Sequence, residues 1–197
     1  MIKGLTIVCL ALITFVAAAE DKVIEQQGKW SIIRQDNWPT PVYIISVEEI
    51  DSQIKLMCMT SYKRIILNFY YFNTKNLDNV VLSSKLMIFT NSNNRKNDLL
   101  GKIYNYSSNA VNWGIYFDYN LKNQKGNKIK SADTFSLVFK QFLTASGDIT
   151  FTAQGEGDTV YQATISSDGL PTMFNHFAQY CGPDFIEAFD LKMKANG

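Results

Sequence analysis

The sequence has few of the side chains on which several classes of site depend. One histidine in 197 residues excludes any site built on two imidazoles, including two-histidine zinc sites. The balance of 19 Lys and Arg against 18 Asp and Glu lacks the basic excess that a nucleic-acid-binding surface requires. After residue 20, no apolar run is long enough to cross a bilayer. We therefore expect neither a nucleic-acid partner nor a membrane span in the mature protein.

Motifs for catalysis and cofactor binding are missing as well. The chain has no Gly-x-Ser-x-Gly elbow, and its glycine-containing turn at 155–157 lacks the lysine and the strand-to-helix setting of a phosphate loop. The acidic residues Glu48, Glu49 and Asp51 match no calcium-loop spacing and are typical of a solvated turn. We expect no catalytic residues, no metal ion and no cofactor.

The composition favours a single folded domain. With 46% hydrophobic, 13% aromatic and 19% charged residues, the chain is too apolar to be disordered. Its length is typical of one domain with a sizeable core. We predict one β-rich domain over residues 20–197.

The first nineteen residues have the composition of a secretory signal. Lys3 supplies the positive start, Gly4–Val16 is an uninterrupted apolar core, and Ala17–Ala19 has the small residues of a cleavage site. An apolar run of about 16 residues is shorter than the roughly 20 of a membrane span, although an uncleaved anchor is the alternative. We predict a cleaved signal peptide at 1–19 and a periplasmic or secreted mature chain.

Removal of the signal leaves two cysteines, Cys58 and Cys181, because Cys9 lies within it. An even pair in an exported protein is typical of a disulfide. The positions are 123 residues apart (181 minus 58), and closing such a loop is worth about 4–5 kcal/mol in the chain-entropy description. Two buried free thiols are the alternative. We predict a Cys58–Cys181 disulfide.

Between Lys29 and Asp118 the sequence has the pattern of short strands separated by polar turns. The candidate strands are rich in β-branched and aromatic residues, and turn residues such as those of Trp38–Pro41 separate them. They are Trp30–Arg34, Val42–Val47, Ile54–Thr60, Arg64–Phe72, Val80–Thr90, Leu100–Tyr106 and Val111–Tyr119. This spacing predicts antiparallel sheets packed as a sandwich or partial barrel.

The hydrophobic period changes after residue 130. The later segments are predicted, in order, as a helix over Ser131–Ala145, a hairpin of Asp148–Gln154 and Thr159–Ser166, a helix from Leu170 to Cys181, and a short last helix over Asp184–Ala195. Ser131 or Asp133 is available to cap the first helix. The fold class is therefore mainly β (α+β), with two or three helices toward the C-terminus packed on the sheet.

The helix that ends at Cys181 also contains His176, the single histidine. A Cys–His pair can act as nucleophile and base, but five residues along a helix separate two side chains by about 140°. The two groups are therefore not expected to meet. We predict that His176 lies on the helix surface, and that Cys181 points toward the sheet, where Cys58 shares a strand face with Ile54 and Leu56.

Aromatic residues are concentrated in the middle strands. Tyrosine and tryptophan are amphipathic and favour interfaces, so some of them are candidates for a recognition surface. The candidate residues are Tyr70, Tyr71, Tyr104, Tyr106, Trp113 and Tyr116. The alternative is that these strands are buried on both faces. A small-ligand carrier, with the aromatic strands lining a cavity, is a further interpretation.

Two short segments resemble parts of a known family. The early strand Gly28–Ile32 and the late segment Ser166–Leu170, which leads into a helix, are similar to segments of the bacterial invasion-associated locus B family. The resemblance implies a small exported β-sandwich protein without catalysis, linked to host-cell colonisation. We therefore expect a non-enzymatic binding protein, a virulence or host-interaction factor, whose partner is a protein or other macromolecule outside the cytoplasm.

Overall fold

The structure is a computed structural model that describes residues 21–72, 84–90, 95–107, 110–119, 127–154 and 160–193. The strands are β1 (Lys22–Gln27), β2 (Trp30–Gln35), β3 (Val42–Glu49), β4 (Ser52–Met59), β5 (Arg64–Phe72), β6 (Ser84–Thr90), β7 (Arg95–Ser107), β8 (Ala110–Asp118), β9 (Asp148–Gln154) and β10 (Val160–Ser166). The helices are α1 (Asn127–Thr144), α2 (Leu170–Cys181) and α3 (Pro183–Ala188), with a short 3-10 turn at Thr60–Tyr62.

Antiparallel pairing connects all these strands in the order β1-β2-β3-β4-β5-β8-β7-β6-β9-β10. The long strand β7 joins the two halves, because its residues 95–101 pair with β6 and its residues 102–107 pair with β8. Among the described strands, β1 and β10 are the two edges and do not pair with each other, so the barrel stays open.

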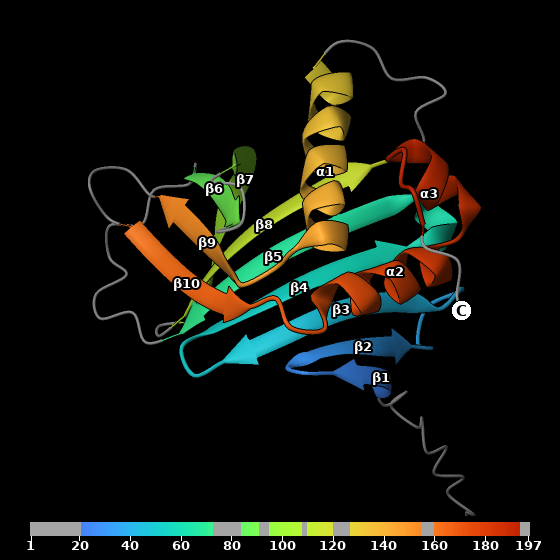
Figure 1. Cartoon of the computed structure of the whole chain (residues 1–197), viewed down its shortest axis with the longest axis horizontal. Coiled ribbons are helices and arrows are strands. Elements are labelled where there is room, and N and C mark those ends of the chain that lie inside the picture. The colour runs from blue at the N-terminus through green and yellow to red at the C-terminus, as the bar shows by residue number, and fades with distance from the viewer. Residues whose placement is uncertain are drawn as a thin grey trace, which may run out of the picture.

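The sheet is curved, and the described helices lie on one side of it (Figure 1). Helix α2 packs against β1, β2 and β3, while α1 packs against β7 and against α2. This arrangement confirms the predicted fold class: a mainly β, antiparallel, partly closed sheet with helices toward the C-terminus packed on it. None of the helices in the described ranges is long and apolar enough to cross a membrane.

Several element boundaries differ from the prediction. Helix α1 begins at Asn127, so neither Ser131 nor Asp133 caps it; no Gly or Pro interrupts 127–144, and the helix therefore extends toward the N-terminus beyond its apolar stripe. Helix α3 ends at Ala188 rather than Ala195, because Asp190 adopts a left-handed backbone with φ of 48°. The strand β1 was not predicted at all.

The core lies between the curved sheet and the helices. Four residues of α1 at helical spacing, Phe135, Val138, Phe139 and Phe142, are almost fully buried there. They meet the apolar face of α2 and the inner faces of the strands. The inner-face residues of β4 and β5 are Ile54, Leu56, Cys58, Ile65, Leu67 and Phe69. Cys58 therefore lies on the inner face together with Ile54 and Leu56, with which it was predicted to share a strand face.

Cys58 and Cys181 are buried in this core as free thiols, so the predicted disulfide is not formed in the structure. Bond formation is an oxidation, and the structure shows the chain in its dithiol state. The sulfur of Cys58 lies 4.0 Å from the hydroxyl oxygen of Tyr119. Burial, and then the neighbouring thiol of Cys58, raise the pKa of Cys181. Thiolate formation is therefore disfavoured in the folded chain.

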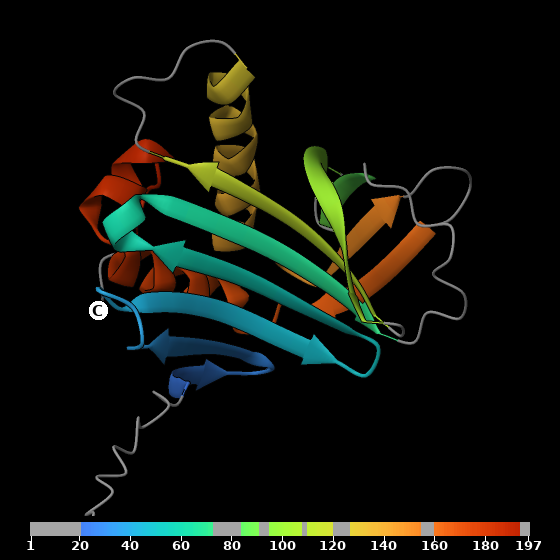
Figure 2. The same ribbon diagram turned by 180° about the vertical axis from the view of Figure 1, so that it is seen from behind.

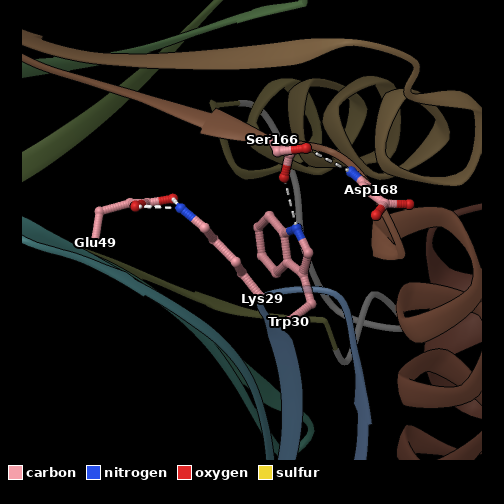
Figure 3. Close-up of polar contacts among 5 residues, drawn as sticks. All are labelled: Lys29, Trp30, Glu49, Ser166 and Asp168. Atoms are coloured by element: carbon pink, nitrogen blue, oxygen red, sulfur yellow. Dashed lines mark hydrogen bonds and ion pairs between the residues drawn. The ribbon is translucent and has the colours of Figure 1, made fainter.

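The β1–β2 hairpin contacts the segment that links the end of β10 to α2. We call this contact the edge clamp, and its residues are Gly28, Trp30, Ser166, Asp168 and Gly169. The indole Nε1 of Trp30 donates a hydrogen bond of 2.9 Å to the carbonyl oxygen of Ser166, whose hydroxyl accepts one of 3.1 Å from the backbone N–H of Asp168 (Figure 3). Beside the clamp, Lys29 forms a 2.7 Å ion pair with Glu49. The β1–β2 turn is thereby fixed to the start of α2.

Substitution of Gly169 by alanine is expected to destabilise the protein by about 2–5 kcal/mol. A Cβ atom at this position would lie 2.6 Å from the carbonyl oxygen of Gln27, and the residue has a φ of +83°. Both the clash with backbone and the left-handed strain therefore oppose the side chain. Urea unfolding followed by circular dichroism measures the loss.

Gly147 is the matched control for this substitution. It also has a positive φ, of +77°, but no atom lies within 4 Å of a Cβ built on it. Gly147→Ala should therefore show only the backbone strain, about 1–2 kcal/mol. Equal losses for the two variants would mean that the close approach at the clamp contributes nothing.

Candidate functional site

The outer face of the sheet lies opposite the helices, and no described helix covers it (Figure 2). Alternation along the strands directs every second side chain to this face. Its centre carries an apolar strip, in which Val42, Ile44 and Met59 are buried and Ile33, Met57 and Ile66 are partly buried. We call these six residues the outer strip. No described helix covers these residues, and the polar side chains of Lys55, Arg64 and Asn68 share the face with them.

Aromatic rings and cations flank the outer strip on β4, β5 and β8. The ammonium of Lys55 lies 5.7 Å from the ring centre of Tyr70, which in turn stacks on Phe72 at 6.4 Å. The guanidinium of Arg64 lies 5.1 Å from the ring centre of Tyr116. Both are cation–π pairs, and tyrosine and arginine are enriched in binding interfaces.

Arg64 is held in place by an acid on the neighbouring strand. Its Nε and Nη2 atoms donate hydrogen bonds of 2.5 and 3.2 Å to the two carboxylate oxygens of Asp118. The hydrogen bond with Asp118 raises the pKa of Arg64 above its ordinary value. The positive charge is therefore already neutralised, and this part of the outer face does not call for an anionic partner.

A groove of about 340 Å³ runs between β5 and β8 on the outer face. Its lining residues are Arg64, Ile66, Asn68, Asn112, Gly114, Ile115 and Tyr116. Gly114 pairs with Asn68 in the sheet register, and its missing side chain leaves a hollow between the larger residues on each side. The polar lining residues are Arg64 and Asn112 toward the two ends and Asn68 opposite Gly114.

The side chain of Asn112, at one end of the groove, has a buried oxygen atom without a hydrogen-bond partner. Asn112 is 7% exposed, and the atom is its Oδ1. Buried polar atoms in native proteins are nearly always hydrogen-bonded, so an exception needs an explanation. The sequence offered one signal for this site: a glycine within a strand pattern, which indicates a bulge or a close approach to the backbone.

The structure divides the six predicted interaction residues between faces. Tyr70 and Tyr116 lie on the outer face, and Tyr116 is 59% exposed. Tyr71, one residue along β5, points inward and packs against Phe69 with ring centres 6.4 Å apart. The side chains of Tyr104, Tyr106 and Trp113 lie outside the part of the structure whose side chains are described. Their backbones belong to β7 and β8.

A second polar cluster joins β1 to α2. The carboxylate of Glu25 accepts hydrogen bonds from Nδ1 of His176 and, at 2.5 Å, from the hydroxyl of Tyr180. The Tyr180 ring stacks on Tyr43 with centres 5.0 Å apart. His176 is partly exposed, as expected, and faces Glu25, whereas Cys181 is buried in the core. The structure therefore does not assemble a Cys181–His176 pair.

The acidic residues behave as solvated or ion-paired side chains. Glu49 pairs with Lys29, and Glu48 accepts a 3.1 Å hydrogen bond from Gln53. No group of three or more His, Cys, Asp or Glu residues able to hold a metal ion occurs within the described ranges.

No protein-family model, curated protein or solved structure matches this chain. The resemblance to the invasion-associated locus B family therefore stays an expectation. The two segments that carry it, around Trp30 and around Asp168, contribute the residues of the edge clamp.

The Glu25 cluster predicts a pH-dependent stability. Burial acts to raise the pKa of Glu25, but hydrogen bonds from Tyr180 and His176, with attraction to His176, outweigh it and hold this pKa below its ordinary 4.5. A lowered folded-state pKa stabilises the fold above the ordinary pKa, and the contribution is lost as the pH falls through the folded value. Glu25→Gln should therefore destabilise the protein at pH 7 and much less at pH 3.

The measurement is urea unfolding of both proteins across pH 3–7. The control is Asp36→Asn, which removes a carboxylate near the same edge of the sheet. Asp36 follows β2 and forms an ion pair with Arg34 on that strand. A Glu25→Gln difference that stays constant over the whole range would contradict the assignment.

Proposed function

We propose that this protein is an exported, non-enzymatic binding protein of a bacterium, and that it acts on a macromolecule through the outer face of its sheet. The observation that carries the proposal is the outer strip with its flanking Tyr70, Tyr116 and Arg64, on a face that no described helix covers. Tyr116 is 59% exposed on this face, and tyrosine and arginine are enriched in binding interfaces.

Export is supported by the composition of the first nineteen residues, in which a positive start precedes an apolar core and three alanines. The mature chain would then work in the periplasm or after release. If the bacterium is host-associated, we propose a virulence or host-interaction role.

We further propose that Cys58 and Cys181 form a disulfide after export. Their neighbours bring them together: Tyr43 pairs with Cys58 across β3 and β4, Tyr180 precedes Cys181, and the rings of Tyr43 and Tyr180 are stacked. In the reaction each thiol loses its hydrogen and the sulfurs join, while the disulfide of an oxidising thiol–disulfide exchange protein is reduced to two thiols. The bond would join α2 to β4.

The test is capture of partners by the immobilised, oxidised mature chain from periplasmic and host-cell-surface extracts, followed by mass spectrometry. Tyr116→Ser should abolish recovery of the captured macromolecule. Ile50→Ser is the matched control, since Ile50 is 95% exposed on the β3–β4 turn, away from the outer strip. Failure to capture any macromolecule, or equal capture by both variants, would overturn the proposal.

A second candidate function, the carriage of a small ligand, is favoured by one observation. The groove at Gly114 has a volume at the lower end of the range of small-molecule sites, about 300–1,000 Å³, and an apolar lining with few polar groups. The sequence suggested a cavity lined by the aromatic strands, whereas this groove lies on the outer face of the sheet.

A further inference from the structure

We propose that the groove between β5 and β8 binds a small neutral ring compound whose edge carries an N–H donor beside an acceptor, as in a primary carboxamide. This inference rests on the second of the two proposed functions, small-ligand carriage, and specifies its ligand. The residues that carry it are Asn112, Gly114 and Tyr116.

The charges that the structure describes around the groove favour a neutral ligand. Among the lining residues whose side chains are described, Arg64 alone is charged, and Asp118 already binds it through two hydrogen bonds. A ligand anion would compete with Asp118 for the Arg64 guanidinium, and a ligand cation would be repelled by the guanidinium. Burial of an unpaired charge against Ile66 would be unfavourable.

The shape of the groove selects for a ring. Gly114 leaves a hollow in the floor, and Ile66 and Tyr116, which are partners in the β5–β8 register, stand beside it. The exposed ring of Tyr116 provides an aromatic wall. A flat apolar group would fill the hollow and contact both side chains, with the offset or edge-on geometry that aromatic pairs prefer.

The polar edge of the ligand follows from Asn112. Its Oδ1 atom has no partner, and a carboxamide supplies both a donor and an acceptor. Rotation about the Cβ–Cγ bond of asparagine is soft, so a turn of the amide can bring Oδ1 toward the groove. A ligand with an N–H beside a carbonyl would then pair with the amide through two hydrogen bonds.

The test uses benzamide and N,N-dimethylbenzamide, which share a ring and a carbonyl but differ in the N–H donor. Binding to the ¹⁵N-labelled mature chain is titrated by NMR, with the Gly114 amide and the Asn112 side-chain amide as reporters. Benzamide should bind, and the dimethyl analogue should bind about tenfold more weakly or worse, as expected for a lost hydrogen bond.

Two variants and one matched control locate the site. Gly114→Ala, which fills the floor, and Asn112→Leu, which keeps the side-chain size but removes the amide, should each weaken benzamide binding about tenfold or more. Gln141→Met is the control. The Oε1 atom of Gln141 is likewise buried without a partner, but it lies on α1, away from the groove. This variant should bind benzamide as the parent does.

The outcomes separate the two levels of the proposal. If both compounds bind equally and Gly114→Ala weakens both, the groove is a ligand site but the amide-edge assignment is wrong. If neither compound shifts the Gly114 signal, the ligand class is overturned, and capture of a macromolecule through Tyr116 still tests the first proposed function. Unchanged benzamide binding in Asn112→Leu would also overturn the inference.

Discussion

Oxidation of the mature chain is expected to raise its free energy of unfolding by about 4–5 kcal/mol, less any strain in the bond. The reason is the long loop between Cys58 and Cys181. The disulfide would close this loop in the unfolded chain and so lower the conformational entropy of the unfolded state. Both cysteines lie in the same buried cluster, so the bond requires no rearrangement of the sheet order. Urea unfolding with and without reductant measures the difference.

The rate of oxidation provides a second readout for the same bond. The thiolate is the reacting form, and burial raises the pKa of Cys181, so the folded dithiol should react slowly with a small disulfide. Oxidation during folding should be fast by comparison. Intact-mass measurement of the exported protein should show the loss of residues 1–19 and of two hydrogens.

The double variant Cys58→Ala/Cys181→Ala is the control, because it removes the bond and keeps the two positions apolar. It should unfold at the same urea concentration in the presence and absence of reductant. Two reactive thiols in the unfolded, non-reduced exported protein would refute the disulfide. The structure, with its two free thiols, would then describe the exported state as well.

Elements that bury one face could be predicted from the sequence, since burial leaves a periodic pattern. The alternation in β4 and β5 and the helical stripe of α2 are examples. All three elements lie where the pattern placed them, although β4 begins two residues earlier. β1 leaves no such pattern. Its two central apolar residues, Val23 and Ile24, are adjacent, and β1 is positioned by pairing with β2 and by the contact of Glu25 with α2. These causes are not local.

The candidate site was harder to predict for the same reason. The tyrosines of β5 and β8 are visible in the sequence, but the face that each occupies depends on the register. Tyr70 and Tyr71 therefore separate to opposite sides of the sheet. The groove needs β5 and β8 to pair with Asn68 opposite Gly114, two positions that are distant in sequence. Sequence patterns do not specify such pairings.

The substitution of Phe139 by alanine is expected to destabilise the protein by about 3–5 kcal/mol. Phe139 is fully buried at the point where α1, α2 and α3 meet. Its ring centre lies between 4.9 and 6.3 Å from those of Phe135, Phe142, Phe174, Phe185 and Phe189. Removal of the ring leaves a cavity among rigid aromatic neighbours, which cannot collapse to fill it.

Leu137→Ala on the same helix separates this packing effect from helix propensity. Leu137 is 50% exposed, so its truncation should change the free energy of unfolding by about 1 kcal/mol or less. Urea unfolding of the reduced proteins keeps the comparison independent of the disulfide. A Phe139→Ala loss as small as that of Leu137→Ala would mean that the three helices do not share a common aromatic core. The placement of α2, and with it of Cys181 over β4, would then lose its support.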